Sequence, residues 1–152
     1  RVRFAVGDFA AAADGLEATR DEAIGLGIRV LSLEAAITLA DVARGLGDTD
    51  RSLEILDAEE ARAGELAAVF GAALARARGE TLLAAGRLDE AASVVSAGLV
   101  SANEHNRLYD RARLLALEAR IARAGRADSG AEALQESVRL LQRLGVIAMP
   151  CR

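Results

Sequence analysis

The sequence has no lysine and no tryptophan, and its single proline, Pro150, stands near its end. Aromatic residues make up only 3% of the 152 positions, whereas hydrophobic residues, mostly alanine and leucine, make up 52%. Alanine and leucine favour helices, and the β-branched and aromatic residues that favour strands are scarce. A hydrophobic share of this size argues against disorder. The composition therefore predicts an all-α protein.

Residues that carry chemistry are equally scarce. Without lysine, the phosphate-binding loop of nucleotide hydrolases cannot be completed. His105 is the only histidine, so no histidine pair can bind a metal ion or assist a nucleophile. Cys151, the only cysteine, cannot form an internal disulfide and has no base beside it. We therefore expect no enzymatic activity, no catalytic residue, no metal site and no cofactor.

The distribution of charged and apolar residues bears on nucleic-acid binding and on membrane insertion. The net charge is −4, and acidic residues alternate with arginines along the chain. No basic patch could follow a phosphate backbone, so direct nucleic-acid binding is not expected. No apolar run approaches the roughly 20 residues of a membrane-spanning helix, and no signal peptide is recognisable. We expect a cytoplasmic chain that, because it begins with Arg1 instead of methionine, is a fragment of a longer protein.

A short pattern that starts with glycine recurs along the chain. Its copies begin 40, 39 and 39 residues apart, at Gly7, Gly47, Gly86 and Gly125. Five residues after each glycine stands a small residue: Ala12, Ser52, Ala91 and Gly130. Nine residues after each stands an aliphatic residue: Leu16, Leu56, Val95 and Leu134. A fixed period indicates a repeat architecture, and we predict repeats at about 7–46, 47–85, 86–124 and 125–152 within one domain, 1–152.

The repeated glycine is predicted to end a helix, since glycine takes the left-handed conformation without steric cost. Asp8, Asp48 or Thr49, and Ser129 can then cap the next helix. A second break divides each of the first three repeats, at 25–27, 64–65 and 103–106. Each of these repeats should therefore contain two antiparallel helices. The predicted helices span 8–25, 29–45, 49–63, 66–85, 88–103, 107–124 and 129–144.

The expected fold class is an α-α superhelix of about seven helices in antiparallel pairs. The small residue of each repeat would let two helices approach closely, and the aliphatic residue would fill their contact. We therefore expect these residues to be largely buried: Ala12, Ala91, Leu16, Leu56, Val95 and Leu134. The helix at 107–124 is apolar on two sides, which predicts that it packs against neighbours on both.

A family resemblance follows from these features. The segment Gly86 to Ala91, Gly-Arg-Leu-Asp-Glu-Ala, resembles the second-helix opening of a tetratricopeptide repeat. The period exceeds that family's roughly 34 residues, and the usual large aromatic of its first helix is absent, with Tyr109 the nearest candidate. Longer periods are similar to the C-terminal sensor regions of large bacterial signalling ATPases. These include LuxR-type transcriptional activators and ATPase-linked adenylate cyclases.

One acidic stretch, Asp57 to Glu60, resembles a site for a divalent ion. Calcium loops need oxygen ligands at alternate positions around a glycine, and this spacing is missing. On a helix, Glu59 and Glu60 point to different faces, and Arg62 follows closely. A solvated outer face is therefore the expected environment of this stretch.

The best candidate for a binding surface is a polar set on the helix at 107–124. The resemblance implies that first helices line the concave face of the array, where arginines hold carboxylates of a peptide or a partner. Arg113 and Arg120 are two helical turns apart and share one face, so they are the predicted anchors, with Arg107 and Tyr109 nearby. The alternative is a surface of intrahelical ion pairs such as Arg107 with Asp110, each worth only tenths of a kcal/mol.

These expectations lead to a non-enzymatic function. The leading hypothesis is a repeat module that binds a protein, a peptide or a small inducer. It would form the regulatory part of a bacterial cytoplasmic signalling or transcription-regulating ATPase. The alternative is a free-standing adaptor scaffold for protein–protein assembly.

Overall fold

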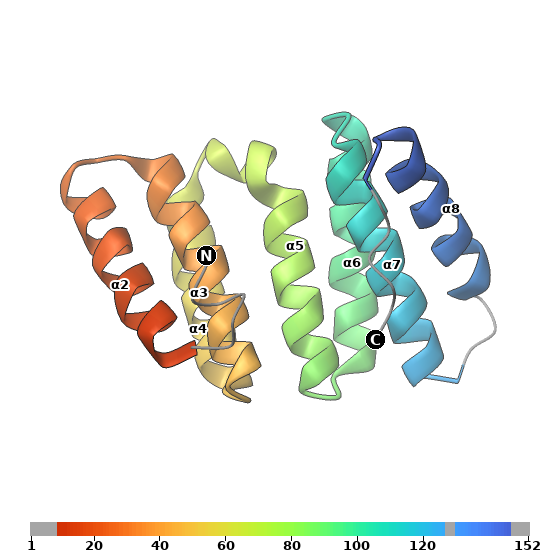
Figure 1. Cartoon of the computed structure of the whole chain (residues 1–152), viewed down its shortest axis with the longest axis horizontal. Helices are drawn as coiled ribbons and strands as arrows, with labels where there is room; N and C mark the ends of the chain where they lie inside the picture. The colour runs from red at the N-terminus through yellow and green to blue at the C-terminus, as the bar shows by residue number, and fades with distance from the viewer. Residues whose placement is uncertain (1–8, 127–129, 147–152) are drawn as a thin grey trace. The chain divides into compact units, whose positions relative to one another are not determined.

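The computed structural model describes residues 9–126 and 130–146, and within these ranges it contains seven α-helices and no strand. The helices are α2 (Phe9–Gly25), α3 (Arg29–Gly45), α4 (Thr49–Ala63), α5 (Leu66–Ala84), α6 (Leu88–Glu104), α7 (Leu108–Ala124) and α8 (Gly130–Arg143). Every predicted helix is present, and no end differs from its predicted position by more than one residue. The predicted all-α fold of consecutive antiparallel helix pairs is confirmed (Figure 1).

The chain divides into two compact units, Arg1–Ala67 and Ala68–Arg152. In unit 1, α3 packs against both α2 and α4. In unit 2, α7 packs against both α6 and α8. The prediction that the helix at 107–124 packs on two sides is therefore confirmed. Its buried residues come from both apolar stripes: Ala112, Leu114, Leu115, Leu117, Ala119 and Ile121.

Most turns between helices share one backbone geometry. At the α3–α4 turn, Gly47 has φ +86°, its N–H donates to Arg44 O, and the Asp48 N–H reaches back to Ala43 O at 3.0 Å. This is the glycine-ended helix stop in which two N–H groups satisfy free carbonyls of the last turn. The same pair of bonds recurs with Gly27, Gly86, Asn106 and Gly145 at the left-handed position.

The α7–α8 turn differs from its prediction. Gly125 has φ −77°, and the left-handed residue is Arg126, with φ +58°. The Arg126 N–H donates to Arg123 O, so the geometry of the stop is kept one residue later than expected. A side chain at φ near +60° is uncommon because of local steric crowding. The assignment of Gly125 as the left-handed residue was wrong.

Helix capping is confirmed where the structure describes it. The Asp48 carboxylate accepts the Arg51 N–H at 3.0 Å and so caps α4, as predicted. The predicted caps Asp8 and Ser129, like the repeat glycine Gly7, lie outside the described residues.

The small residue of each repeat marks a close approach between paired helices. In α4, Ser52 is fully buried and its hydroxyl donates to Ala40 O of α3 at 2.9 Å. In α8, a methyl group on Gly130 would lie 3.0 Å from Ala119 O of α7. Between α5 and α6, a methyl group on Gly79 would lie 2.8 Å from Val95 and 3.9 Å from Ala91 O. Three helix pairs therefore make the same contact with three different residue combinations.

The burial predictions hold for most of these positions. Ala12, Leu56, Ala91 and Val95 are each less than 9% exposed, as expected. Leu16 is only half-buried, and Leu134 is 38% exposed, so the expectation of burial was wrong for Leu134. The reason is the number of neighbours. Val95 of α6 lies between α5 and α7, whereas α8 packs on α7 and is followed by no helix within the described ranges.

Candidate partner-binding surface

The four predicted binding residues lie at or near the start of α7 and along its exposed side. Tyr109 is 50% exposed, and Arg113 and Arg120 are also exposed. Residues three, four and seven apart share a helix face, so these three side chains form one stripe. The buried residues of α7 pack against α6 and α8, and this packing fixes the direction in which the stripe points. We call Tyr109, Arg113 and Arg120 the α7 stripe.

Two of the stripe's side chains contact each other. The Arg113 guanidinium carbon lies 5.9 Å from the centre of the Tyr109 ring, which is within cation–π distance. The contact reduces the freedom of an otherwise long and mobile side chain. The arginine is therefore presented beside an aromatic ring, a combination that is enriched at protein interfaces.

Arg107 pairs with a carboxylate of its own helix, and its part in partner binding stays a prediction. It is the N-terminal flanking residue of α7, is only half-exposed, and its Nε donates to Asp110 Oδ2 at 2.9 Å. This is the intrahelical pair that the alternative hypothesis expected. Arg111 also forms an ion pair, but with Glu136 of α8 at 3.4 Å, so it helps to hold the helix pair together.

Arg113 and Arg120 have no carboxylate partner, a property that they share with Arg123, Arg126 and Arg143 among the described residues. Neither forms an ion pair or donates a hydrogen bond within residues 9–126 and 130–146. Most arginines that the structure describes are engaged, for example Arg87, which makes two hydrogen bonds to Glu90. These bonds hold the pKa of the Glu90 carboxyl below its usual value. The α7 stripe thus leaves two positive charges uncompensated on a chain whose net charge is −4.

The corresponding stripe of unit 1 has a different character. When α3 and α7 are aligned on their first residues, the α7 stripe falls on three positions of α3: Val30, Glu34 and Asp41. Five of the six buried positions of α7 match buried small or aliphatic residues of α3, and the sixth, Leu117, matches the half-buried Thr38. Tyrosine and the two arginines are therefore a property of one repeat and are not required by the fold.

A second feature, in unit 1, was missed by the sequence analysis. Glu59 is only 3% exposed, which contradicts the expectation of a solvated acidic face, although the neighbouring Glu60 is exposed as expected. Its Oε1 accepts a bond from Arg62 at 3.2 Å and lies 3.6 Å from Arg20 Nε. Glu59 stands seven residues after the buried Ser52, and this two-turn spacing is the signal that could have located it.

Other candidate chemistry finds little support. No group of three or more His, Cys, Asp or Glu side chains is placed to hold a metal ion in the part of the chain that the structure describes. His105 stands in the exposed turn after α6, where its Nδ1 lies 2.9 Å from Ser101 O. Cys151 lies outside the described residues. Within the described ranges, no helix combines the length and the apolar character needed to cross a membrane.

Comparison with known proteins adds evidence on the fold. Neither models of protein families nor the sequences of curated proteins produce a match. The crystal structure of BtubC (BKLC) from P. vanneervenii is similar, with a TM-score of 0.74 and 24% sequence identity over 91% of this chain. The match covers 57% of the BtubC chain, so this chain spans little more than half of its length. At this identity the likeness supports the fold alone.

Proposed function

We propose that the chain is a non-enzymatic binding module that recognises an acidic segment of a protein or peptide through the α7 stripe. The observation that carries the proposal is the pair of exposed arginines without carboxylate partners, one of them held beside Tyr109. A carboxylate of a partner would supply the missing counter-charge, and the planar guanidinium would receive it with two parallel hydrogen bonds. Because the arginines lie on a packed helix, they lose less freedom on binding than loop residues would.

Within a cell, the proposed role is regulatory. The resemblance to the sensor regions of large bacterial signalling or transcription-regulating ATPases supports a cytoplasmic module that reports the presence of its partner to an attached effector. Binding would favour one packing arrangement of the repeats over another and so shift the effector between states. A small inducer is an alternative ligand for such a region.

The α7 stripe can be tested by affinity capture. Wild-type protein and an Arg113→Ala, Arg120→Ala double variant are used as bait in a bacterial lysate, and captured proteins are quantified by mass spectrometry. We expect the double variant to lose at least nine-tenths of the partner that the wild type retains. The partner should also dissociate as salt is raised, because exposed charge pairs are screened.

A matched control is available on the neighbouring helix. Arg139 and Arg143 of α8 are both exposed, so an Arg139→Ala, Arg143→Ala variant removes the same charge from the same unit. It should capture the partner as the wild type does. Equal capture by the wild type and by the α7 double variant, at equal thermal stability, would show that the stripe is not the binding surface.

The adaptor alternative predicts a different stoichiometry. A free-standing scaffold brings two proteins together, so it should form a ternary complex in which the α7 double variant loses only one of the two. A sensor module should bind one partner at a time. Size-exclusion chromatography with light scattering on the captured proteins distinguishes the two outcomes.

A further inference from the structure

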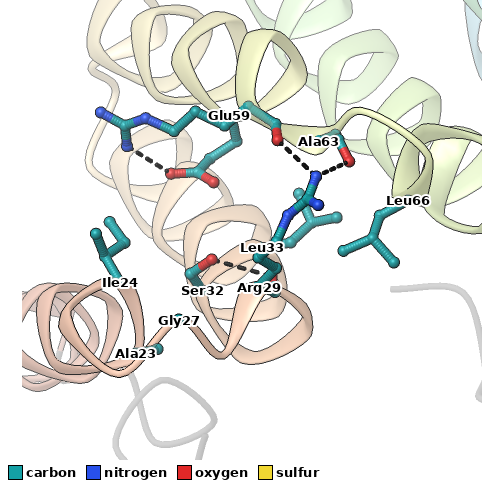
Figure 2. A pocket seen from close by; sticks show the side chains of 10 residues that line it. Ala23, Ile24, Gly27, Arg29, Ser32, Leu33, Glu59, Ala63 and Leu66 are labelled. Carbon is teal, nitrogen blue, oxygen red and sulfur yellow. Dashed lines mark hydrogen bonds and ion pairs between the residues drawn. The ribbon is translucent and has the colours of Figure 1, made fainter.

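A small cavity lies among the three helices of unit 1, independent of the α7 stripe (Figure 2). Its volume is about 130 Å³. Five apolar side chains from α2, α3, α4 and the first residue of α5 line it: Ala23, Ile24, Leu33, Ala63 and Leu66. Three charged side chains complete the lining: Arg29, Glu59 and Arg62. The cavity is therefore apolar along its walls and charged at one side.

The cavity lies at a level where the α3–α4 pair has two large residues and other helix pairs have small ones. Leu33 stands seven residues before Ala40, and Glu59 seven residues after Ser52, so the two are the next facing positions along the α3–α4 contact. The matching positions in the other pairs are Ala72 with Gly98 and Ala112 with Ser137. The α3–α4 pair therefore carries two larger side chains at this level than the α7–α8 pair does.

The Arg29 side chain is positioned at the cavity by hydrogen bonds to the C-terminal end of α4. The α4 helix ends at Gly64, which has φ +52° and ψ −126°, and its last carbonyls are capped by a side chain. Arg29 Nη2 donates to Ala63 O at 2.7 Å and to Arg62 O at 3.1 Å, as Figure 2 shows. A methyl group at position 64 would lie 2.9 Å from Arg29 Nη2, so the arginine would have to shift, and the positive φ of this residue itself favours glycine. The guanidinium is thus held in place before any ligand arrives.

Hydrogen-bond donors exceed acceptors around the cavity. Arg29 uses only Nη2, and its Nε and Nη1 have no hydrogen-bond partner among the described residues. Arg20, behind Glu59, has a buried Nε that likewise makes no hydrogen bond. Arg20 and Arg62 flank the Glu59 carboxylate, and Arg29 adds a further positive charge to the lining. The partial negative charge at the end of α4 offsets only about half a unit of this excess. The local charge therefore favours an anion over a cation.

We infer that this cavity binds a short-chain aliphatic carboxylate. The Arg29 guanidinium, whose Nη1 donates to no described residue, receives one carboxylate oxygen with a charge-assisted hydrogen bond. The alkyl chain lies among Ile24, Leu33 and Leu66. A cavity of about 150 Å³ lined by apolar side chains accepts benzene, so the volume of about 130 Å³ here suits the alkyl chain of a ligand such as pentanoate, with its head group at Arg29.

The test is a titration of the ¹⁵N-labelled 152-residue chain, followed by ¹H–¹⁵N correlation spectra. The probes are pentanoate, pentan-1-ol and pentan-1-amine, which share the alkyl chain and differ in the charge of the head group. Pentanoate should shift the amide signals of Gly27, Ser32 and Ala63 saturably, with a dissociation constant at least tenfold below those of the alcohol and the amine. Absence of saturable shifts at these residues would overturn the inference.

Two substitutions in the α2–α3 turn provide a matched comparison. Ile24→Glu places a negative charge on a residue that lines the cavity, and it should raise the pentanoate dissociation constant at least tenfold. Leu26→Glu adds the same charge at a 66% exposed position that does not line the cavity, and it should change the constant less than twofold. Both side chains are well exposed, so both variants should fold.

The remaining outcomes also decide the question. Tighter binding of pentan-1-amine than of pentanoate would assign the cavity to cations held by Glu59 and refute the carboxylate. Equal binding of all three probes would reduce the cavity to an unselective apolar void. Loss of pentanoate binding in Leu26→Glu as well as in Ile24→Glu would place the ligand outside the cavity. None of these results depends on the α7 stripe, so the proposed function is tested separately.

Discussion

The α3–α4 pair of unit 1 and the α7–α8 pair of unit 2 are two copies of the same contact with different outcomes. Each pair approaches closely at a small residue, Ser52 against Ala40 in one and Gly130 against Ala119 in the other. Two turns farther along, α7 and α8 meet again, where the Ser137 hydroxyl donates to Ala112 O at 2.7 Å. At the same level, α3 and α4 carry Leu33 and Glu59, and a cavity lies beside them.

The difference shows what a repeat requires and what it leaves open. A buried serine is satisfied by one carbonyl, so the α7–α8 contact needs nothing from outside the pair. A buried glutamate needs counter-charges, and Arg20 of α2 and Arg62 of α4 supply them. One small contact per pair is therefore enough to preserve the fold. The second facing position can vary, and in unit 1 it holds the charged residue Glu59 beside a cavity.

The largest effect is expected from truncating the bulky member of the unit 1 contact. Leu33 is 2% exposed, and Leu33→Ala removes buried methyl groups and enlarges a space that already exists. We expect a loss of about 2–5 kcal/mol in the free energy of unfolding. Urea denaturation followed by circular dichroism measures this loss. Leu31→Ala, at a 40% exposed position of the same helix, should lose far less, and an equal loss in both would refute the packing argument.

Placing a bulky residue at the small position of unit 2 is expected to lower the free energy of unfolding somewhat less. Ala112 is completely buried against α8, and Ala112→Leu introduces the unit 1 side chain where the helices are closed. Overpacking of this kind costs about 1–3 kcal/mol. Ala131→Leu, on an exposed position of α8, is the control and should leave the urea midpoint unchanged. If Ala112→Leu also leaves it unchanged, the two contacts are not equivalent.

The smallest effect concerns the serine hydroxyls that the two pairs share. Ser52→Ala and Ser137→Ala each remove one buried hydrogen bond to a backbone carbonyl, and each should cost about 1 kcal/mol. Similar shifts of the two urea midpoints would support a common contact in both units. Ser93→Ala, at an exposed position of α6, should have no measurable effect. A control variant as destabilised as the two buried ones would remove the basis of the comparison.

Local features of the chain were enough to predict the helices. Glycine at the left-handed position, a capping side chain such as Asp48 and the spacing of apolar residues act within one or two helical turns. For this reason all seven helix ranges and the repeat register could be predicted without a structure. The one error in a turn, at Gly125, arose because Arg126 takes the left-handed conformation that glycine usually supplies.

The candidate sites were predictable only in part. The α7 stripe could be proposed because Arg113 and Arg120 share a helix face whatever surrounds the helix. Their lack of ion-pair partners within the described ranges, and the contact between Arg113 and Tyr109, depend on rotamers and on neighbouring helices. The cavity of unit 1 could not be predicted, since Arg29 and Ala63 meet there from distant parts of the sequence.

By itself, the sequence determined the helical class, the positions of the helices and the period of their pairing, because these follow from interactions between residues close together along the chain. Only the tertiary structure decided the burial of positions where the repeat pattern fails. Leu134 has the same repeat position as Leu56 and is exposed, while Glu59, in an acidic stretch, is buried. Burial at these two positions depends on how many helices surround them, which residues of the same helix do not determine.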